Sequence, residues 1–140
     1  MLKIVIDTNI LISAAISPSG KTAQVVNLIL TDESFDLCLS KAVLNEYEVV
    51  LTYEKFTKIH HFASQSVKLL GAFKLFGEIF NPTQIVDILT DKSDNKLLEL
   101  AEVAEADFLI TGNTKHFNLD FFGKTRIVTP TEFWELFKTE

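Results

Sequence analysis

The sequence predicts an α/β domain in which helices cover both faces of a parallel sheet. Short apolar runs of strand length alternate with segments that carry apolar residues at helical spacing, and this alternation is typical of parallel sheets. The 140 residues show no internal repeat, low-complexity tract or linker, so we expect one compact domain over residues 1–140. A hydrophobic share of 47% is enough to fill the core of such a domain.

The first half of the chain predicts two strands and three helices. In chain order they are the strand Leu2–Ile6, the helices Ile10–Ile16 and Lys21–Leu30, the strand Phe35–Leu39, and a helix that runs to about Thr52. The turn-rich cluster Ser17-Pro18-Ser19-Gly20 separates the first two helices. Ser40 is a suitable N-cap for the third helix.

The second half predicts three further strands and three helices. They are the helix Ile59–Phe76, the strand Glu78–Phe80, the helix Asp94–Glu105, the strands Phe108–Ile110 and Arg126–Val128, and a C-terminal helix that begins at Pro130. Pro is well tolerated at the first position of a helix, which supports the last assignment. Thr111-Gly112-Asn113 reads as a turn after the fourth strand.

Composition narrows the classes of protein to consider. A net charge of −6 argues against broad electrostatic binding of nucleic acid, which usually shows as a basic surface, but it leaves room for an enzyme that reaches phosphates through bound cations. Cys38 is the one cysteine, so no intrachain disulfide is expected and a reducing compartment is favoured. No apolar run approaches ~18 residues, and the N-terminus leads into a strand rather than a signal peptide. We therefore expect a soluble, cytoplasmic protein without membrane association.

Acidic and amide side chains follow the predicted strands, where ligands bind in open parallel sheets. Asp7 follows the first strand and Glu46 lies on the helix after the second. Asp91 and Asp94 flank the start of the helix before the fourth strand, and Asn113 follows that strand. With the first strand at the centre, these side chains would meet in one crevice. Oxygen ligands without Cys or His suit Mg²⁺ or Mn²⁺, and crowded carboxylates need a cation to offset their repulsion.

These residues also have purely structural explanations. Asp and Thr are favoured N-caps, so Asp7 with Thr8, and separately Asp91 and Asp94, are each explained by capping alone. Helical periodicity places Glu46 on one flank of the buried stripe and Glu48 on the other, and it does not choose between them.

Four motifs, taken together, resemble those of the PIN domain nucleases. They are Ile4–Asn9, Ser40–Glu46, Asp91–Ala101 and Ala106–Asn113, the last followed by Lys115-His116-Phe117. One Asp after a first strand is weak support, whereas all four motifs in this order and at these separations are a specific signal. The similarity runs from Leu2 to about Phe137 and is to the branch assigned to the toxins of bacterial toxin–antitoxin pairs.

The resemblance implies a three-layer α/β/α fold with a parallel sheet of four or five strands. It also implies a ribonuclease that depends on Mg²⁺ or Mn²⁺ and gives a 5′-phosphate and a 3′-hydroxyl. The implied catalytic and metal-binding residues are Asp7, Glu46, Asp94 and Asn113, with Thr8, Asn9 and Thr111 as supporting polar residues. It therefore selects Glu46 over Glu48, and it makes Asp107 a structural residue.

Asn113 departs from the family pattern, because close relatives commonly carry Asp at that position. An amide oxygen can still ligate a hard cation but brings no charge. A second metal would therefore bind less tightly until the substrate phosphate supplies more oxygens. Lys92, Lys96 and Lys115 lie near the expected rim and are candidates for phosphate binding, although surface lysines are often only solvated.

Two other functions fit parts of the pattern. A catalytically weak or inactive PIN-like module that binds RNA or protein would account for Asn113 and for the acidic net charge. A phosphotransfer receiver also places Asp after strands, but receivers begin with paired acids where this chain has Asp7-Thr8-Asn9.

The segment Ile59–Phe76 is a candidate surface for binding a protein partner. It is amphipathic, with Phe62, Leu69, Leu70, Phe73 and Phe76 on one side. Core packing explains such a stripe, and the alternative is a surface for a second copy of the chain or for an antitoxin. We expect a homodimer, RNA as the substrate and an antitoxin protein as a further partner.

Overall fold

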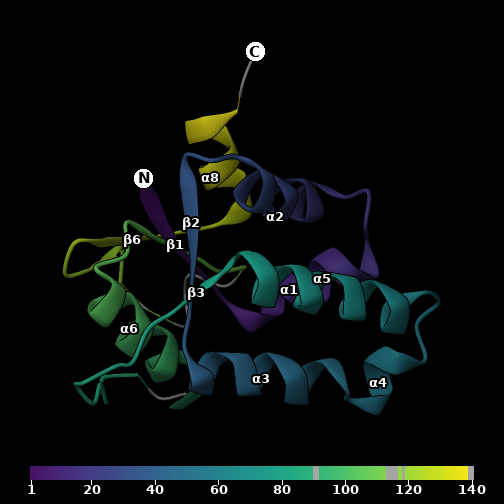
Figure 1. The fold of residues 1–140 in the computed structure, drawn as a ribbon, viewed down its shortest axis with the longest axis horizontal. Coiled ribbons are helices and arrows are strands. Elements are labelled where there is room, and N and C mark those ends of the chain that lie inside the picture. Colours follow the sequence, from purple (N-terminus) through teal and green to yellow (C-terminus); the bar gives the residue numbers. More distant parts are fainter. Residues whose placement is uncertain (90–91, 113–116, 118, 139–140) are drawn as a thin grey trace.

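The computed structural model describes residues 1–89, 92–112, 117 and 119–138, and of residues 92 and 93 it describes the backbone alone. Figure 1 shows a central sheet with helices on both sides. The strands are β1 (Leu2–Ile6), β2 (Phe35–Leu39), β3 (Glu78–Ile79), β4 (Phe108–Ile110), β5 (Phe121–Phe122) and β6 (Thr125–Val128). Their order in the sheet is β3-β2-β1-β4-β6-β5. Five of these strands are parallel and β5 runs antiparallel to β6, so the predicted parallel sheet is confirmed.

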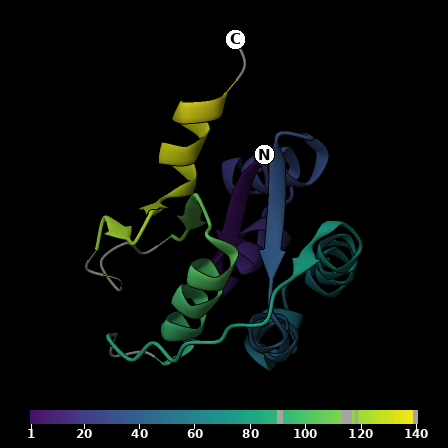
Figure 2. The same cartoon turned by 60° about the vertical axis from the view of Figure 1, so that its left-hand side comes forward.

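The helices form two layers around this sheet. They are α1 (Thr8–Ile16), α2 (Lys21–Thr31), α3 (Lys41–Leu51), α4 (Glu54–Thr57), α5 (Phe62–Phe76), α6 (Lys92–Ala104) and α8 (Pro130–Phe137). In Figures 1 and 2, α6 lies on one side of the strands and α1, α2 and α5 lie on the other. Helix α3 crosses below the end of the sheet toward which β2 points. The predicted three-layer arrangement is therefore confirmed.

Strand β1 is central, as its composition predicts. Residues Ile4, Val5 and Ile6 are fully buried, because strands with helices on both faces carry continuous apolar runs rather than alternating ones. Ile6 is in register with Ile110 of β4. The carboxyl ends of these two neighbouring strands therefore lie side by side. Asp7, the first residue after β1, lies at this end of the sheet.

Several boundaries differ from the sequence-based prediction. Helix α5 begins at Phe62 rather than Ile59, because His61 has a left-handed backbone (φ 63°) that a right-handed helix cannot contain. Two short elements, α4 and β5, were not predicted. With four and two residues, they are too short to produce a periodic apolar signal.

The apolar stripe of α5 is only partly a core stripe. Phe62 and Phe73 are fully buried, as predicted. Phe76, the last residue of the helix, is 62% exposed, so core packing does not account for this member of the stripe. Val67 and Leu75 of the same helix are also exposed. In the described residues, no helix combines the length and the apolar character needed to cross a membrane.

Cys38 of β2 predicts a pH effect on stability. Its side chain is fully buried, and burial raises the pKa of the thiol from 9.0 to about 12. Below pH 9.0 both folded and unfolded chains keep the proton. Above it the unfolded chain ionises first, so the free energy of unfolding falls as pH rises toward 12.

Urea unfolding at about pH 8 and at about pH 10.5 tests this expectation. Ionisation of Cys38 should lower the free energy of unfolding by ~1–2 kcal/mol between these two pH values. The control is Cys38→Ala, which should lose less stability between the two pH values than the unsubstituted protein. A thiol that reacts with iodoacetamide as fast in the native state as in urea would contradict the assignment.

Candidate active site

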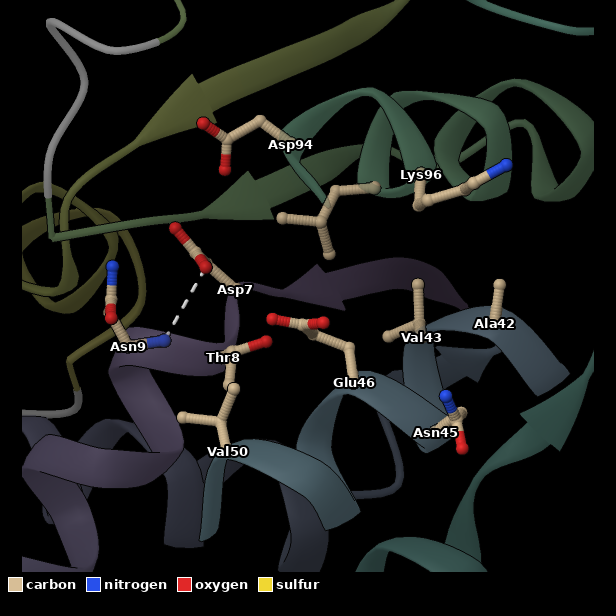
Figure 3. A pocket seen from close by; sticks show the side chains of 11 residues that line it. Asp7, Thr8, Asn9, Ala42, Val43, Asn45, Glu46, Val50, Asp94 and Lys96 are labelled. Carbon is tan, nitrogen blue, oxygen red and sulfur yellow. Dashed lines mark hydrogen bonds between the residues drawn. The ribbon is translucent and has the colours of Figure 1, made fainter. Parts of the chain in front are cut away.

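A cavity of about 390 Å³ lies where β1 ends, between α3 and the beginning of α6. Three predicted site residues line it from three separate elements: Asp7 directly after β1, Glu46 of α3 and Asp94 of α6. Figure 3 shows their carboxylates directed toward the same space. Residues separated by up to 87 positions in the sequence therefore share one pocket, as the sequence predicts.

Asp7 is a helix cap and a pocket residue at once. Its backbone N–H donates to the carbonyl of Ile110 (2.9 Å), which extends the β1–β4 pairing by one residue. Its Oδ1 accepts from the backbone N–H of Asn9 (3.4 Å), so Asp7 is the N-cap of α1. Its Oδ2 accepts from the Thr111 hydroxyl (2.7 Å). The capping interpretation is thus correct but incomplete, since the carboxylate is also part of the cavity wall.

Helix α3 resolves the choice between Glu46 and Glu48. Ser40 caps this helix by accepting from the N–H of Val43 (3.2 Å), and the buried stripe then fixes its rotation against the core. Glu46 is half-buried and lines the pocket. Glu48 is exposed and pairs with Lys74 of α5 (2.9 Å), on the side away from the pocket. The two glutamates therefore face different surroundings.

Asp94 lies in the first turn of α6 and is not its N-cap, because the helix begins at Lys92. Its side chain is 8% exposed. The preceding chain is fixed by Asn95, whose Oδ1 accepts from the N–H of Leu89 (2.9 Å) and whose Nδ2 donates to the Leu89 carbonyl (3.1 Å). These two bonds tie Leu89 to the first turns of the helix that carries Asp94.

The supporting residues take different positions. Thr8 is buried and Asn9 is exposed, and both residues line the pocket. Thr111 is fully buried, and its hydroxyl bond holds the Asp7 carboxylate in place. Asn45 also lines the pocket and was not predicted. An exposed Asn within a helix gives no sequence signal, so only the fold reveals its position.

Lys96 lines the pocket but extends away from the carboxylates (Figure 3). Its ammonium lies 3.5 Å from Glu99 Oε1, and the other oxygen of Glu99 accepts from the N–H of Val86 (3.0 Å). Lys96 is therefore held at the rim by Glu99.

Several predicted residues lie outside the described part of the chain. They are Asp91, Asn113 and Lys115, together with the side chain of Lys92. Asp107 is described, and its Oδ2 accepts from the N–H of Lys3 (2.8 Å) while its Oδ1 pairs with Lys124 (3.5 Å). These contacts tie the beginning of β4 to β1, at the opposite edge of the sheet from the pocket. They agree with the structural role expected for Asp107.

The chemistry of the pocket fits a hard divalent cation, since its acidic ligands are carboxylate oxygens. Among the described residues, however, no three His, Cys, Asp or Glu side chains form a ready group that could hold a metal ion. The three carboxylates are arranged around the cavity rather than gathered at one point, as mutual repulsion favours.

The chain thus combines a parallel α/β/α fold with an acidic pocket at the carboxyl end of its central strand. The chain belongs to the PIN domain family, whose sequence model matches residues 3–115. The resemblance identified from the four motifs is thereby confirmed at the level of the family. Membership also decides against the receiver domain considered from the sequence.

Two known proteins illustrate the similarity. An uncharacterized protein of Methanocaldococcus jannaschii is 30% identical over 145 residues, an alignment that covers 98% of this chain and 92% of that protein. A crystal structure of VapBC2 from Rickettsia felis, bound to a DNA fragment from their promoter, aligns with a TM-score of 0.57 at 16% identity. That alignment covers 91% of this chain and 98% of the matched one, and it shows a shared fold.

Proposed function

We propose that the protein is a ribonuclease that hydrolyses RNA phosphodiester bonds with the help of Mg²⁺ or Mn²⁺. One observation carries this proposal: Asp7, Glu46 and Asp94 line a single pocket in a chain of the PIN domain family. No other described cavity of comparable size is lined by acids from three elements that meet at the end of the central strand. Members of this family are generally nucleases, which supports the same conclusion.

Asp7, Glu46 and Asp94 would hold the ion, with the amide oxygen of Asn113 as a fourth, uncharged ligand. A bound divalent ion lowers the pKa of a coordinated water and offsets the negative charge that develops on the phosphate. Within the chain, the Asn9 N–H and the Thr111 hydroxyl each donate to one oxygen of Asp7, and the two bonds together fix the orientation of its carboxylate in the pocket wall. The buried positions of Asp7 and Asp94 exclude much of the competing solvent.

Phosphate contacts beyond the ion would come from single lysines, because the net charge of −6 provides no broad basic surface. Lys96 is the described lysine at the pocket, and Lys92 and Lys115 are proposed from the sequence. The Lys96 side chain is half-exposed at the rim, so its ammonium could contact a phosphate while Glu99 holds it there.

We further propose that the protein acts in the cytoplasm as the toxin of a toxin–antitoxin pair, with an antitoxin as its partner. The resemblance of its motifs to that branch supports this role, as does the fold shared with VapBC2. A groove between α3 and α5 suits an amphipathic helix, because its lining combines the apolar residues Leu51, Ala63, Val67 and Leu70 with polar ones that include Glu48 and Lys74. Homodimer formation stays a prediction from the sequence.

A cleavage assay on mixed RNAs tests the proposal. We expect cleavage to rise with Mn²⁺, to stop when EDTA removes the ion, and to leave 5′-phosphate ends that can be ligated. The measurement is product length on a denaturing gel with and without phosphatase treatment. Cleavage that persists in EDTA would contradict a metal-dependent mechanism.

The second candidate function is an inactive or weakly active PIN-like module that binds RNA or protein. Asn113 favours it, because the amide leaves three formal charges for metal binding where four are common. RNA that is bound but stays intact across the whole Mn²⁺ titration would support this alternative over the nuclease.

A further inference from the structure

Tyr47 connects the two elements that carry Asp7 and Glu46. Its hydroxyl donates to the carbonyl of Ile6, the last residue of β1. Asp7 follows Ile6 directly, and Glu46 precedes Tyr47 on α3. One hydrogen bond between residues 41 positions apart therefore joins the immediate neighbours of two pocket carboxylates.

The ring of Tyr47 is fixed by the core. The residue is fully buried, and its ring packs edge-on against Phe73 of α5, with centroids 5.8 Å apart and an interplanar angle of 80°. Phe73 is itself fully buried. A buried tyrosine needs a hydrogen-bond partner for its hydroxyl, and here the core packing directs that hydroxyl at the end of β1.

This connection matters because Asp7 and Glu46 face each other across the cavity as like charges. Asp7 is attached to β1 and Thr111, whereas the position of Glu46 depends on how α3 lies against the sheet. The ion has to contact both carboxylates, and the helix α3 sets how far the Glu46 side chain must reach. A displacement of α3 from β1 would change that reach and weaken ion binding.

We propose that Tyr47 is a positioning residue that fixes α3 against the end of β1 and thereby sets the affinity of the pocket for its divalent ion. The proposal rests on the metal-dependent function proposed above. It assigns Tyr47 no contact with the ion or with RNA. Its effect is on how Asp7 and Glu46 are placed before the ion arrives.

The test compares Tyr47→Phe with Tyr53→Phe. Each variant loses one phenolic oxygen, and these are the two tyrosines of the chain. Tyr53 is a matched control because it is 45% exposed and stacks on Phe56 at the surface, outside the pocket lining. Tyr47→Phe keeps the ring that fills the core, so far-UV circular dichroism should show an intact fold.

Calorimetric titration with MnCl₂, without RNA, measures the affinity directly. We expect Tyr47→Phe to bind Mn²⁺ about 3- to 10-fold more weakly, less than the loss typical for groups bonded directly to a ligand, and Tyr53→Phe to bind as the unsubstituted protein does. In cleavage assays the Mn²⁺ concentration for half-maximal activity should shift by the same factor, with kcat at saturating Mn²⁺ unchanged.

The outcomes separate this inference from the proposed function. If the unsubstituted protein binds Mn²⁺ and Tyr47→Phe binds it equally well, the positioning role is overturned and the nuclease proposal stands. A lower melting temperature with unchanged Mn²⁺ affinity would show a purely structural role and overturn it as well. If the unsubstituted protein binds no Mn²⁺, the proposed function fails, and the inference with it.

Discussion

Asp7→Asn should reduce Mn²⁺-dependent RNA cleavage by more than ~100-fold, because it removes a charge from the proposed ion site. The pocket would keep the carboxylates of Glu46 and Asp94, which are too few to hold the ion tightly. Single-turnover cleavage with excess protein is the measurement, since it does not depend on product release. Undiminished cleavage by a variant free of contaminating nuclease would reject the assignment of Asp7.

The same substitution should leave the fold intact. The Asn side chain keeps an oxygen that can accept from the N–H of Asn9, so the cap of α1 is preserved. The Thr111 hydroxyl can rotate to accept from the new amide. We expect a stability change of no more than ~1–2 kcal/mol in urea unfolding. Asp32→Asn is the control for the loss of one carboxylate charge outside the pocket. Asp32 likewise accepts from a backbone N–H, that of Ser34 (2.8 Å), but at an exposed site.

Glu46→Gln should abolish most of the activity and Glu48→Gln should leave it unchanged, although the residues are two positions apart. Glu46→Gln removes a charge from the pocket, so cleavage should fall by more than ~100-fold and Mn²⁺ affinity should fall with it. Glu48→Gln breaks only the exposed pair with Lys74, so activity should be unchanged and stability should fall by less than ~1 kcal/mol.

The two glutamine variants are matched in helix, chemistry and size. Measuring kcat/KM and the half-saturating Mn²⁺ concentration for both therefore isolates the position of the carboxylate. An equal loss of activity in both variants would mean that charge on α3 acts generally. The specific role of Glu46 would then be lost.

Short-range patterns in the sequence are enough to predict the central strand and the position of the pocket. An apolar run followed at once by Asp7 predicted both the central strand and the pocket at its end. The order of the strands then brought Glu46 and Asp94 to the same edge. Periodicity could not separate Glu46 from Glu48, because both flank the buried stripe of α3. The structure separates them through the packing of α3 against α5 and α6.

The sequence alone does not predict polar contacts between residues that are far apart along the chain. Helical spacing with Val43 and Val50 places Tyr47 in the buried stripe of α3, but its bond to Ile6 depends on how two distant elements meet. The same holds for Asn95 and Glu99, whose side chains bind the backbone of the segment before α6. A helical wheel shows which side of a helix is buried. It does not show which backbone group a polar atom on that side will reach.

The two flanks of the sheet carry a consequence for self-association. Both outermost strands, β3 and β5, contain only two residues. Each flank therefore offers too few main-chain donors and acceptors for another polypeptide to continue the ladder, which is how many proteins avoid fibre-like growth. Two molecules should therefore not associate by continuing the sheet across either flank.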